Sequence, residues 1–152
     1  MSVKTNAMRM LDRAKIKYEL KPFPEGEKAY KYLGLPENQI YKTLVTTNTQ
    51  GKYFVFVLPS SEELDLKKAA SLTGCKRIEM LKQKDLLPLT GYVHGGCSPV
   101  GMKKLFPTII DESARNWDTI VCSAGKVGNL MAINPEDLSQ LISAKFFSII
   151  KK

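Results

Sequence analysis

The stretch that decides how the chain is interpreted is Tyr92-Val93-His94-Gly95-Gly96-Cys97-Ser98-Pro99-Val100-Gly101. Its three glycines, its serine and its proline favour neither a helix interior nor a central strand. Glycine has no Cβ, so a loop of this kind can bring backbone N–H groups close to a bound molecule. A surface turn between two elements is the alternative interpretation, and the loop alone does not separate the two.

A second unusual run is Tyr41-Lys42-Thr43-Leu44-Val45, in which a lysine and a threonine open an apolar segment. The segment itself is typical of a buried strand. Lys42 lies either at the exposed end of that strand or in a cleft. In a cleft, its ammonium group could hold a phosphate, a carboxylate or an ester carbonyl oxygen.

Length and composition predict one globular domain over residues 1–152. Hydrophobic residues make up 43% and charged residues 25% of the chain, as in an ordinary folded protein and unlike a disordered one. No apolar run approaches the roughly 20 residues that a membrane span needs, and residues 1–21 contain no signal-peptide core. We therefore expect a cytoplasmic protein without a membrane partner.

The balance of charge favours an anionic partner, and the cysteines argue against a metal site. With 23 basic and 15 acidic side chains, the net charge is +8, which attracts phosphates; simple solubility is the alternative explanation. The chain has three cysteines without a CxxC pair, and one histidine. This pattern favours neither a disulfide framework nor a zinc site, so no metal is expected.

The hydrophobic pattern predicts an α+β fold with a mixed, partly closed β-sheet and flanking helices. The 40–47 and 53–59 strands form a hairpin through a turn at 48–52. Asp65 and Asn134 are predicted helix caps, and Gly34 and Gly74 are predicted helix ends. Helices are expected over residues 2–13, 27–33, 66–73, 82–87 and 135–143, and further strands over 16–20, 77–79, 108–111, 119–123 and 145–150.

The usual catalytic groups are sparse. A nucleophile activated by histidine needs that histidine within hydrogen-bond reach, and the single one, His94, lies three positions before Cys97. A cysteine hydrolase built on this pair stays open as a weaker hypothesis. Asp111 and Glu112 are adjacent, so on a strand they would point to opposite faces and would not act as a carboxylate pair.

Taken together, these runs resemble the YbaK/EbsC family, the freestanding aminoacyl-tRNA deacylases related to the editing domain of bacterial prolyl-tRNA synthetase. The resemblance covers nearly the whole chain, and its specificity comes from the order and spacing of its pieces. They are Lys42-Thr43-Leu44-Val45, Leu64-Asp65-Leu66-Lys67-Lys68, Thr90-Gly91-Tyr92, Gly95-Gly96, Ser98-Pro99, Gly101, Pro107-Thr108-Ile109-Ile110-Asp111, Ser123-Ala124-Gly125-Lys126, Gly128 and Asp137-Leu138.

The resemblance implies a trans-editing deacylase that clears a mischarged amino acid, above all cysteine from a proline tRNA. In the cysteine-clearing members the thiol of the substrate attacks its own ester and leaves as a thiolactone; other members use a positioned water and the ribose 2′-hydroxyl. The protein then supplies positioning and electrostatic support, without a cofactor. Lys42 is the catalytic residue that the resemblance implies, with Thr43 lining the site. Backbone N–H groups of Gly95, Gly96 and Gly101 would surround the aminoacyl group, with Ser98 as a polar contact.

The chain departs from the family pattern at three positions. Phe23 stands where an aromatic hydroxyl is expected in the substrate site. Val127 and Leu130 replace an arginine and an acid, so the acidic group that would orient the substrate amine is missing or is supplied by another residue such as Asp111. These departures concern the amino-acid specificity more than the reaction class.

The resemblance also implies the partners. Aminoacyl-tRNA is the expected substrate, with prolyl-tRNA synthetase as a partner in a transient complex, and DNA is not expected. The alternative function is a non-catalytic module that binds tRNA or an aminoacyl-adenosine through an altered pocket. Binding of a non-hydrolysable aminoacyl-adenosine without release from a real substrate would indicate that module.

Overall fold

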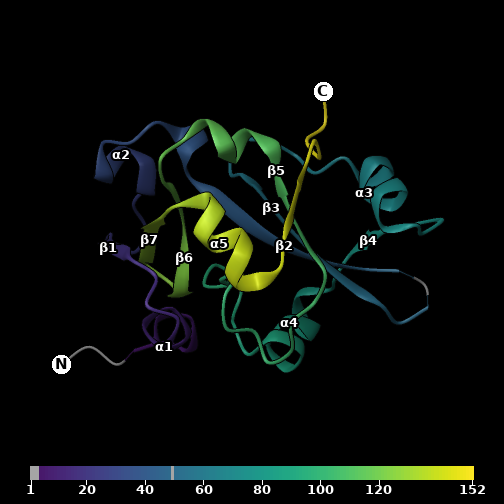
Figure 1. Cartoon of the computed structure of the whole chain (residues 1–152), viewed down its shortest axis with the longest axis horizontal. Coiled ribbons are helices and arrows are strands. Elements are labelled where there is room, and N and C mark those ends of the chain that lie inside the picture. The colour runs from purple at the N-terminus through teal and green to yellow at the C-terminus, as the bar shows by residue number, and fades with distance from the viewer. Residues whose placement is uncertain (1–3, 49) are drawn as a thin grey trace.

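The computed structural model describes residues 4–48 and 50–152, and its helices and strands confirm the α+β class (Figure 1). None of the helices in this part of the chain is long and apolar enough to cross a membrane. The elements are α1 (Asn6–Arg13), β1 (Tyr18–Pro22), α2 (Ala29–Leu33), the 3-10 helix η1 (Glu37–Gln39), β2 (Tyr41–Thr47), β3 (Tyr53–Pro59), α3 (Leu66–Thr73), β4 (Glu79–Met80), α4 (Gln83–Thr90), β5 (Thr108–Asp111), the 3-10 helix η2 (Glu112–Asn116), β6 (Ile120–Lys126), β7 (Asn129–Ile133), α5 (Pro135–Ile142) and β8 (Lys145–Phe147).

The strands form two open sheets. The larger has the order β4-β2-β3-β5-β8, with antiparallel pairing around β2 and parallel pairing of β3 with β5 and of β5 with β8. The smaller is antiparallel and has the order β1-β7-β6. A single bridge between Ile40 and Val121 links the start of β2 to β6. The expectation of one partly closed sheet was therefore wrong, because β1 pairs with β7 and leaves the larger sheet open.

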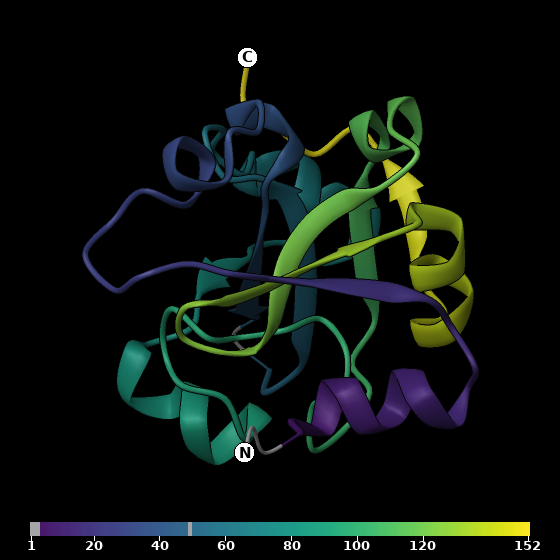
Figure 2. The same ribbon diagram turned by 90° about the vertical axis from the view of Figure 1, so that its left-hand side faces the viewer.

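Of the four buried apolar clusters in the described residues, the two largest hold the layers together. The main core lies between the larger sheet, the smaller sheet, α1 and α5, and includes Val57, Ile110, Met131 and Leu138. Figure 2 shows β1 crossing in front of the larger sheet, with α5 beside it and α1 below. The second core packs the opposite face of the larger sheet against α3 through side chains such as Phe56. Each fully buried large apolar side chain contributes roughly 1.5–3 kcal/mol.

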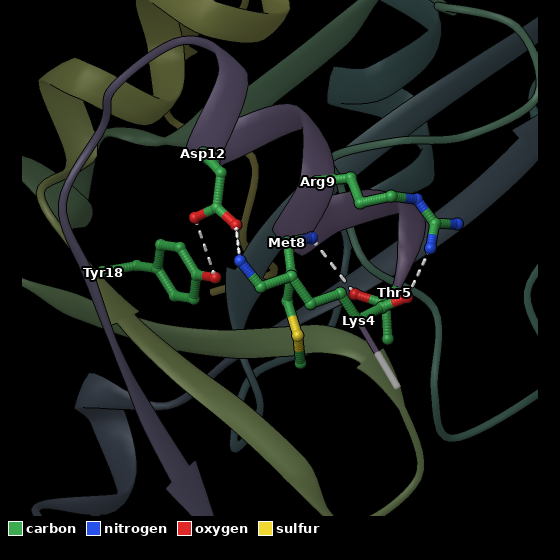
Figure 3. Close-up of polar contacts among 6 residues, drawn as sticks. All are labelled: Lys4, Thr5, Met8, Arg9, Asp12 and Tyr18. Atoms are coloured by element: carbon green, nitrogen blue, oxygen red, sulfur yellow. Dashed lines mark hydrogen bonds and ion pairs between the residues drawn. The ribbon is translucent and has the colours of Figure 1, made fainter. Parts of the chain in front are cut away.

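Helix α1 begins at residue 6 because Thr5 caps it. The Thr5 Oγ1 accepts a hydrogen bond from the Met8 N–H at 3.1 Å and donates to the Ala124 carbonyl at 2.6 Å. Asp12 holds the other end of the segment through an ion pair with Lys4 and a hydrogen bond from the Tyr18 hydroxyl at 3.3 Å (Figure 3). The predicted helix over 2–13 therefore started too early, and residues 2 and 3 lie outside the described part of the chain.

The predicted helix caps at Asp65 and Asn134 and the predicted helix ends at Gly34 and Gly74 are confirmed, whereas the helix predicted over 27–33 begins at Ala29. Asp65 caps α3 by accepting from the N–H groups of Lys67 and Lys68 at 3.0 and 3.1 Å. Asn134 caps α5 in the same way, accepting from Glu136 and Asp137. After α2 and α3 the chain leaves each helix through a glycine, Gly34 or Gly74, in the left-handed conformation. Local capping signals therefore place these helix ends correctly.

The largest error at the level of elements is strand β7, which was not predicted. It pairs with both β6 and β1 and is the central strand of the smaller sheet. Helix α4 is also longer than the predicted 82–87, since it continues through Pro88 to Thr90. In the predicted turn at 48–52, Asn48 accepts from the N–H groups of Gln50 and Lys52, both at 2.9 Å. Residue 49 of that turn lies outside the described residues.

Candidate active site

One pocket of about 550 Å³ brings the start of β2 together with the glycine loop. Its walls come from the end of β1, α2, η1, β2, α4, the glycine loop, β6 and β7. Figure 2 shows α2 and α4 on one flank of the molecule. Four of the residues predicted for the site line this pocket: Phe23, Lys42, Thr43 and Gly95. Segments far apart in the sequence thus converge on one cavity.

Lys42, a half-buried residue, lines the pocket. Its Nζ donates a hydrogen bond to the Ser60 carbonyl at 3.3 Å. Within residues 4–48 and 50–152, no carboxylate oxygen lies within 4.0 Å of it. A neutral acceptor leaves the positive charge uncompensated, so Lys42 can take a phosphate or an oxyanion as a partner.

Thr43 brings a hydroxyl without a partner. Its Oγ1 is the one buried side-chain oxygen or nitrogen of the described residues that makes no hydrogen bond. A buried hydroxyl left without a partner costs roughly 1–3 kcal/mol, so such groups are rare in folded proteins. A substrate atom that pairs with Thr43 Oγ1 would remove that cost.

In the described structure, the edge of β2 that faces away from β3 has only a bridge from Ile40 to Val121 before it meets β4. The Ser60 N–H donates to the Ile40 carbonyl at 2.7 Å, and the Asn48 N–H donates to the Lys52 carbonyl at 3.1 Å. In an antiparallel pair this pattern means that the backbone N–H and C=O groups of the even-numbered residues of β2 face β3. Those of the odd-numbered residues face the opposite edge of the strand. On that edge β4 pairs only with Thr46 and Thr47, so the Thr43 backbone is turned toward the pocket side.

The glycine loop reaches the pocket through Gly95, which has φ +85°. Gly96 lies behind it, packed against the turn between β6 and β7. A Cβ on Gly96 would lie 3.0 Å from the Val127 nitrogen. The absence of a side chain therefore lets the loop press on that turn, and Gly96 fixes the position of Gly95 from outside the pocket.

Ser98 and Gly101 support the loop and do not line the pocket. The Ser98 side chain is fully buried, and its Oγ accepts from the Val100 N–H at 3.2 Å. Gly101 has φ +80°, and a Cβ there would lie 2.8 Å from backbone atoms of Asn6 and Ala7. The Tyr92 hydroxyl donates to the Val100 carbonyl at 2.6 Å, which ties the two ends of the loop together.

The three positions that depart from the family pattern lie near one another. The Phe23 N–H donates to the Gly128 carbonyl at 2.9 Å, which joins the end of β1 to the β6–β7 turn. Phe23 and Leu130 both line the pocket, and neither can donate or accept a side-chain hydrogen bond. Val127 is 42% exposed beside Gly95. This wall is therefore apolar where the family pattern has polar groups.

Asp111 lies outside the pocket. It is 2% exposed, and its carboxylate accepts from the Ile149 N–H at 3.0 Å and from the Ser113 N–H at 3.1 Å. These bonds cap η2 and tie β5 to the C-terminal segment. Both oxygens are thus engaged in holding the fold, and the carboxylate that does line the pocket is Glu37.

Cys97 and His94 both line the pocket, without a hydrogen bond between their side chains in the described structure. Burial raises the pKa of the Cys97 thiol to about 11, although a hydrogen bond with Thr90 acts in the opposite direction. At neutral pH the thiol stays protonated, and the thiolate is the nucleophilic form. The geometry therefore gives no support to a hydrolase built on Cys97.

Sequence reasoning did not identify several residues that shape the pocket. Tyr30 on α2 and Leu86 on α4 supply aromatic and aliphatic walls, Ser123 supplies a hydroxyl, and Glu37 supplies an acid. None of them stands out in its local sequence, because ordinary surface patterns explain each one. Within residues 4–48 and 50–152, no three histidine, cysteine, aspartate or glutamate side chains gather as a metal site would require.

Comparison with known proteins gives a consistent result. The model of the aminoacyl-tRNA editing domain matches residues 21–141. EbsC of Enterococcus faecalis, whose name carries a provisional assignment as a Cys-tRNA(Pro)/Cys-tRNA(Cys) deacylase, is 43% identical over 98% of this chain and 94% of its own. The proline–tRNA ligase of Trichlorobacter lovleyi is 26% identical over 62% of this chain and 16% of its own.

A solved structure confirms the fold. It is described as a provisional trans-editing enzyme for prolyl-tRNA synthetase, and it superposes with a TM-score of 0.86 at 24% identity, over 99% of this chain and 100% of that chain. With the match of the editing-domain model and the near full-length similarity to EbsC, the chain belongs to the aminoacyl-tRNA editing domain family.

Proposed function

We propose that the chain is a trans-acting aminoacyl-tRNA deacylase, and that its preferred substrate is cysteine carried by a proline tRNA. Membership of the editing family supports the reaction class, and the name of the Enterococcus faecalis relative supports the substrate. The observation that carries the proposal is the pocket at Lys42. In one cavity it combines an ammonium that has no carboxylate partner and a buried hydroxyl that has no partner at all among the residues that the structure describes.

In this proposal the protein acts by positioning and by charge. Lys42 takes the ribose or phosphate side of the terminal adenosine together with the oxygen of the reacting ester. The Thr43 hydroxyl donates to a second substrate oxygen, and the Gly95 N–H contacts the aminoacyl group. Donors placed where negative charge develops commonly accelerate acyl transfer by about 100-fold or more, at roughly 3 kcal/mol for each donor.

The thiol of the substrate replaces a protein nucleophile. Its sulfur loses a proton to solvent and attacks the ester carbonyl carbon, so a carbon–sulfur bond forms. The carbon–oxygen bond to the ribose then breaks, and the ribose oxygen takes up a proton. The products are a thiolactone of cysteine and a tRNA with a free 3′ end. The raised pKa of Cys97 is consistent with this route, because it leaves the pocket without a reactive thiolate of its own.

Glu37 is the carboxylate best placed to orient the ammonium group of the substrate. It is the one aspartate or glutamate among the residues that line the pocket in the described structure. Asp111, the residue suggested by the sequence for this role, is engaged in backbone hydrogen bonds elsewhere. The proposal therefore assigns the contact with the substrate amine to Glu37, and leaves Asp111, Ser98 and Gly101 as structural residues.

The test is release of labelled amino acid from proline tRNA charged with cysteine, alanine or proline. Wild type is measured beside Lys42→Ala, with Lys17→Ala as a matched control because Lys17 is exposed and lies outside the pocket. We expect rapid loss of cysteine, abolished in Lys42→Ala alone. Loss of alanine instead would identify alanine as the substrate and water as the nucleophile. If all three charged tRNAs stay intact, the proposed activity is refuted.

The second candidate is a binding module that has lost turnover. The apolar wall formed by Phe23 and Leu130 is the observation that favours it, because it removes polar groups from the substrate site. The two candidates differ in one measurement. A binding module binds a non-hydrolysable cysteinyl-adenosine and leaves charged tRNA intact, whereas an enzyme releases the amino acid from charged tRNA.

The proposal also places the protein in the cytoplasm, where charged tRNA is made and used. A transient complex with prolyl-tRNA synthetase would deliver the mischarged tRNA before it reaches the ribosome. The similarity to part of a proline–tRNA ligase supports this partner. Co-elution of the protein with prolyl-tRNA synthetase only in the presence of proline tRNA is the expected result, and its absence at micromolar concentrations would argue for free tRNA as the direct partner.

A further inference from the structure

A second pocket, of about 520 Å³, lies at the C-terminal end of α4. The end of the β2–β3 hairpin, the last turns of α4 and the segment over residues 103–107 form its walls. Three lysines line it, Lys52, Lys103 and Lys104, and no aspartate or glutamate of the described chain does. This pocket therefore concentrates positive charge within a protein that already carries a net charge of +8.

The floor of this second pocket is aromatic and apolar. Tyr53 and Phe106 meet edge to face with ring centroids 5.6 Å apart, and both line the pocket. They pack on the buried side chains of Val45 and Val55, which hold the floor rigid from behind. Leu105, which is 54% exposed, adds an apolar side chain to the lining.

The three lysines have no acidic partners. Within residues 4–48 and 50–152, no carboxylate oxygen lies within 4.0 Å of Lys52, Lys103 or Lys104. The Lys103 Nζ donates to the Pro88 carbonyl at 3.3 Å, which draws its stem across the end of α4. Lys52 is held in place by its N–H, which donates to Asn48 Oδ1 at 2.9 Å. The three exposed ammonium groups therefore border the pocket and are available to an anion.

Helix α4 connects the second pocket to the proposed active site. Leu86 lines the active-site pocket and Leu89 lines the second one. These residues are three positions apart on one helix, or about 4.5 Å along its axis. Both leucines pack in the same apolar cluster, so the two pockets border one face of α4 and a ligand longer than one nucleotide can extend from one pocket toward the other.

We propose that the second pocket binds another nucleotide of the same tRNA, with its phosphates on Lys52, Lys103 and Lys104 and its base on the aromatic floor. The inference rests on the proposed function. Proteins that bind single-stranded RNA combine a basic groove with aromatic side chains on which bases stack, and this pocket holds both. The unpaired 3′ end of a charged tRNA offers such nucleotides next to the terminal adenosine. The pocket would then contribute to the affinity for tRNA and not to the chemical step.

The test compares two substrates and three triple variants. The substrates are full-length Cys-tRNA(Pro) and cysteinyl-adenosine, which is too short to reach the second pocket. Lys52→Glu, Lys103→Glu and Lys104→Glu are combined in the first variant. Lys17→Glu, Lys67→Glu and Lys152→Glu form the control, since these exposed lysines line neither pocket and change the net charge equally. A third variant with arginine at 52, 103 and 104 keeps the charge, and thermal melts verify the fold of each.

We expect the first variant to lose about tenfold or more in kcat/KM on full-length tRNA relative to the control, through KM. Its activity on cysteinyl-adenosine stays at the wild-type level, and the arginine variant retains both activities. The slope of log affinity against log salt for uncharged tRNA becomes shallower by about one to two, because the lysines no longer neutralise the two phosphates that flank the bound nucleotide.

The outcomes separate the inference from the proposed function. If wild type releases cysteine from neither substrate, the proposed function fails, and binding of uncharged tRNA still decides the inference. The inference about the second pocket is overturned if the first variant and the control lose tRNA binding equally. It is also overturned if the wild-type protein does not bind tRNA. Unchanged tRNA binding together with lost binding of prolyl-tRNA synthetase overturns it too, and identifies the pocket as a protein interface.

Discussion

The Lys42 ammonium lies 3.3 Å from the Ser60 carbonyl oxygen, across the open end of the β2–β3 hairpin. Ser60 follows β3 directly, and its own N–H is bonded to Ile40 just before β2. The lysine is therefore steadied by a neutral group on a rigid hairpin while its charge stays available. A side chain held in this way can meet an incoming anion with little reorganisation.

Replacing Lys42 tests whether this charge is used. Lys42→Ala should lower kcat/KM for release of cysteine by about 100-fold or more, the usual effect of removing a donor to a developing oxyanion. Its free energy of unfolding should change by only about 0.5 kcal/mol, because one exposed hydrogen bond is removed. Lys42→Arg keeps the charge and should retain more activity than Lys42→Ala. Equal activity of all three proteins would remove Lys42 from the mechanism.

Replacing Thr43 with valine separates stability from activity. The change removes a buried hydroxyl that has no partner and keeps the shape of the side chain. Chemical denaturation should therefore show an increase of about 1 kcal/mol in the free energy of unfolding. If the hydroxyl contacts substrate, kcat/KM falls at the same time. A valine variant that is less stable would mean that an ordered water satisfies Thr43 in the protein.

The sequence predicted well what local chemistry decides. The Asp65 and Asn134 caps and the glycines that end α2 and α3 act on their own turn of helix, so each could be identified from a few neighbouring residues. Strand β7 was missed because its role is not local. Its residues form a central strand only through β1, which precedes it by more than a hundred positions in the register Tyr18 to Ile133.

The candidate site shows the same division. Lys42 and Thr43 are polar residues in an apolar strand, an anomaly visible in the sequence, and both line the pocket. Asp111 is likewise a polar residue in an apolar strand, yet its partners are the N–H groups of Ser113 and of Ile149, and the latter lies 38 residues away. Whether a polar residue stabilises the fold or lines the site depends on such distant partners. Their proximity in space cannot be deduced from a single sequence.

Gly101 should be the least replaceable glycine of the loop. In Gly101→Ala the Cβ would lie 2.8 Å from the α1 backbone at a φ of +80°, so the loop and the helix must separate. We expect a loss of about 2–4 kcal/mol in the free energy of unfolding. Gly74→Ala is the matched control, because φ is +71° with nothing within 4 Å of the added Cβ. It should cost about 1 kcal/mol. Similar losses in both would show that φ alone matters.

Cys97 should react slowly and should weaken the protein at high pH. Its pKa is raised from 9.0 to about 11 by burial, so the folded state favours the protonated thiol. That stability is fully present below pH 9 and is lost as the pH rises from 9 toward 11, by at most about 1–3 kcal/mol. Urea unfolding of wild type and Cys97→Ala at several pH values measures it: the difference between them should shrink across this window. Alkylation of Cys97 at about pH 7.5 as fast as that of a free thiol would contradict the buried environment.

Asp111→Ala should destabilise the protein without altering the chemistry of the pocket. The carboxylate is 2% exposed and accepts two backbone N–H groups, which lose their partner in the variant. We expect a loss of about 2–4 kcal/mol in the free energy of unfolding, since bonds to a charged acceptor are worth more than neutral ones. Release of cysteine per folded molecule, measured well below the melting temperature, should stay near the wild-type value.

Glu37→Gln provides the contrast: it should fold normally and raise KM for the charged tRNA, because Glu37 lines the pocket and Asp111 does not. A loss of activity in folded Asp111→Ala with no effect of Glu37→Gln would return the substrate-binding role to Asp111.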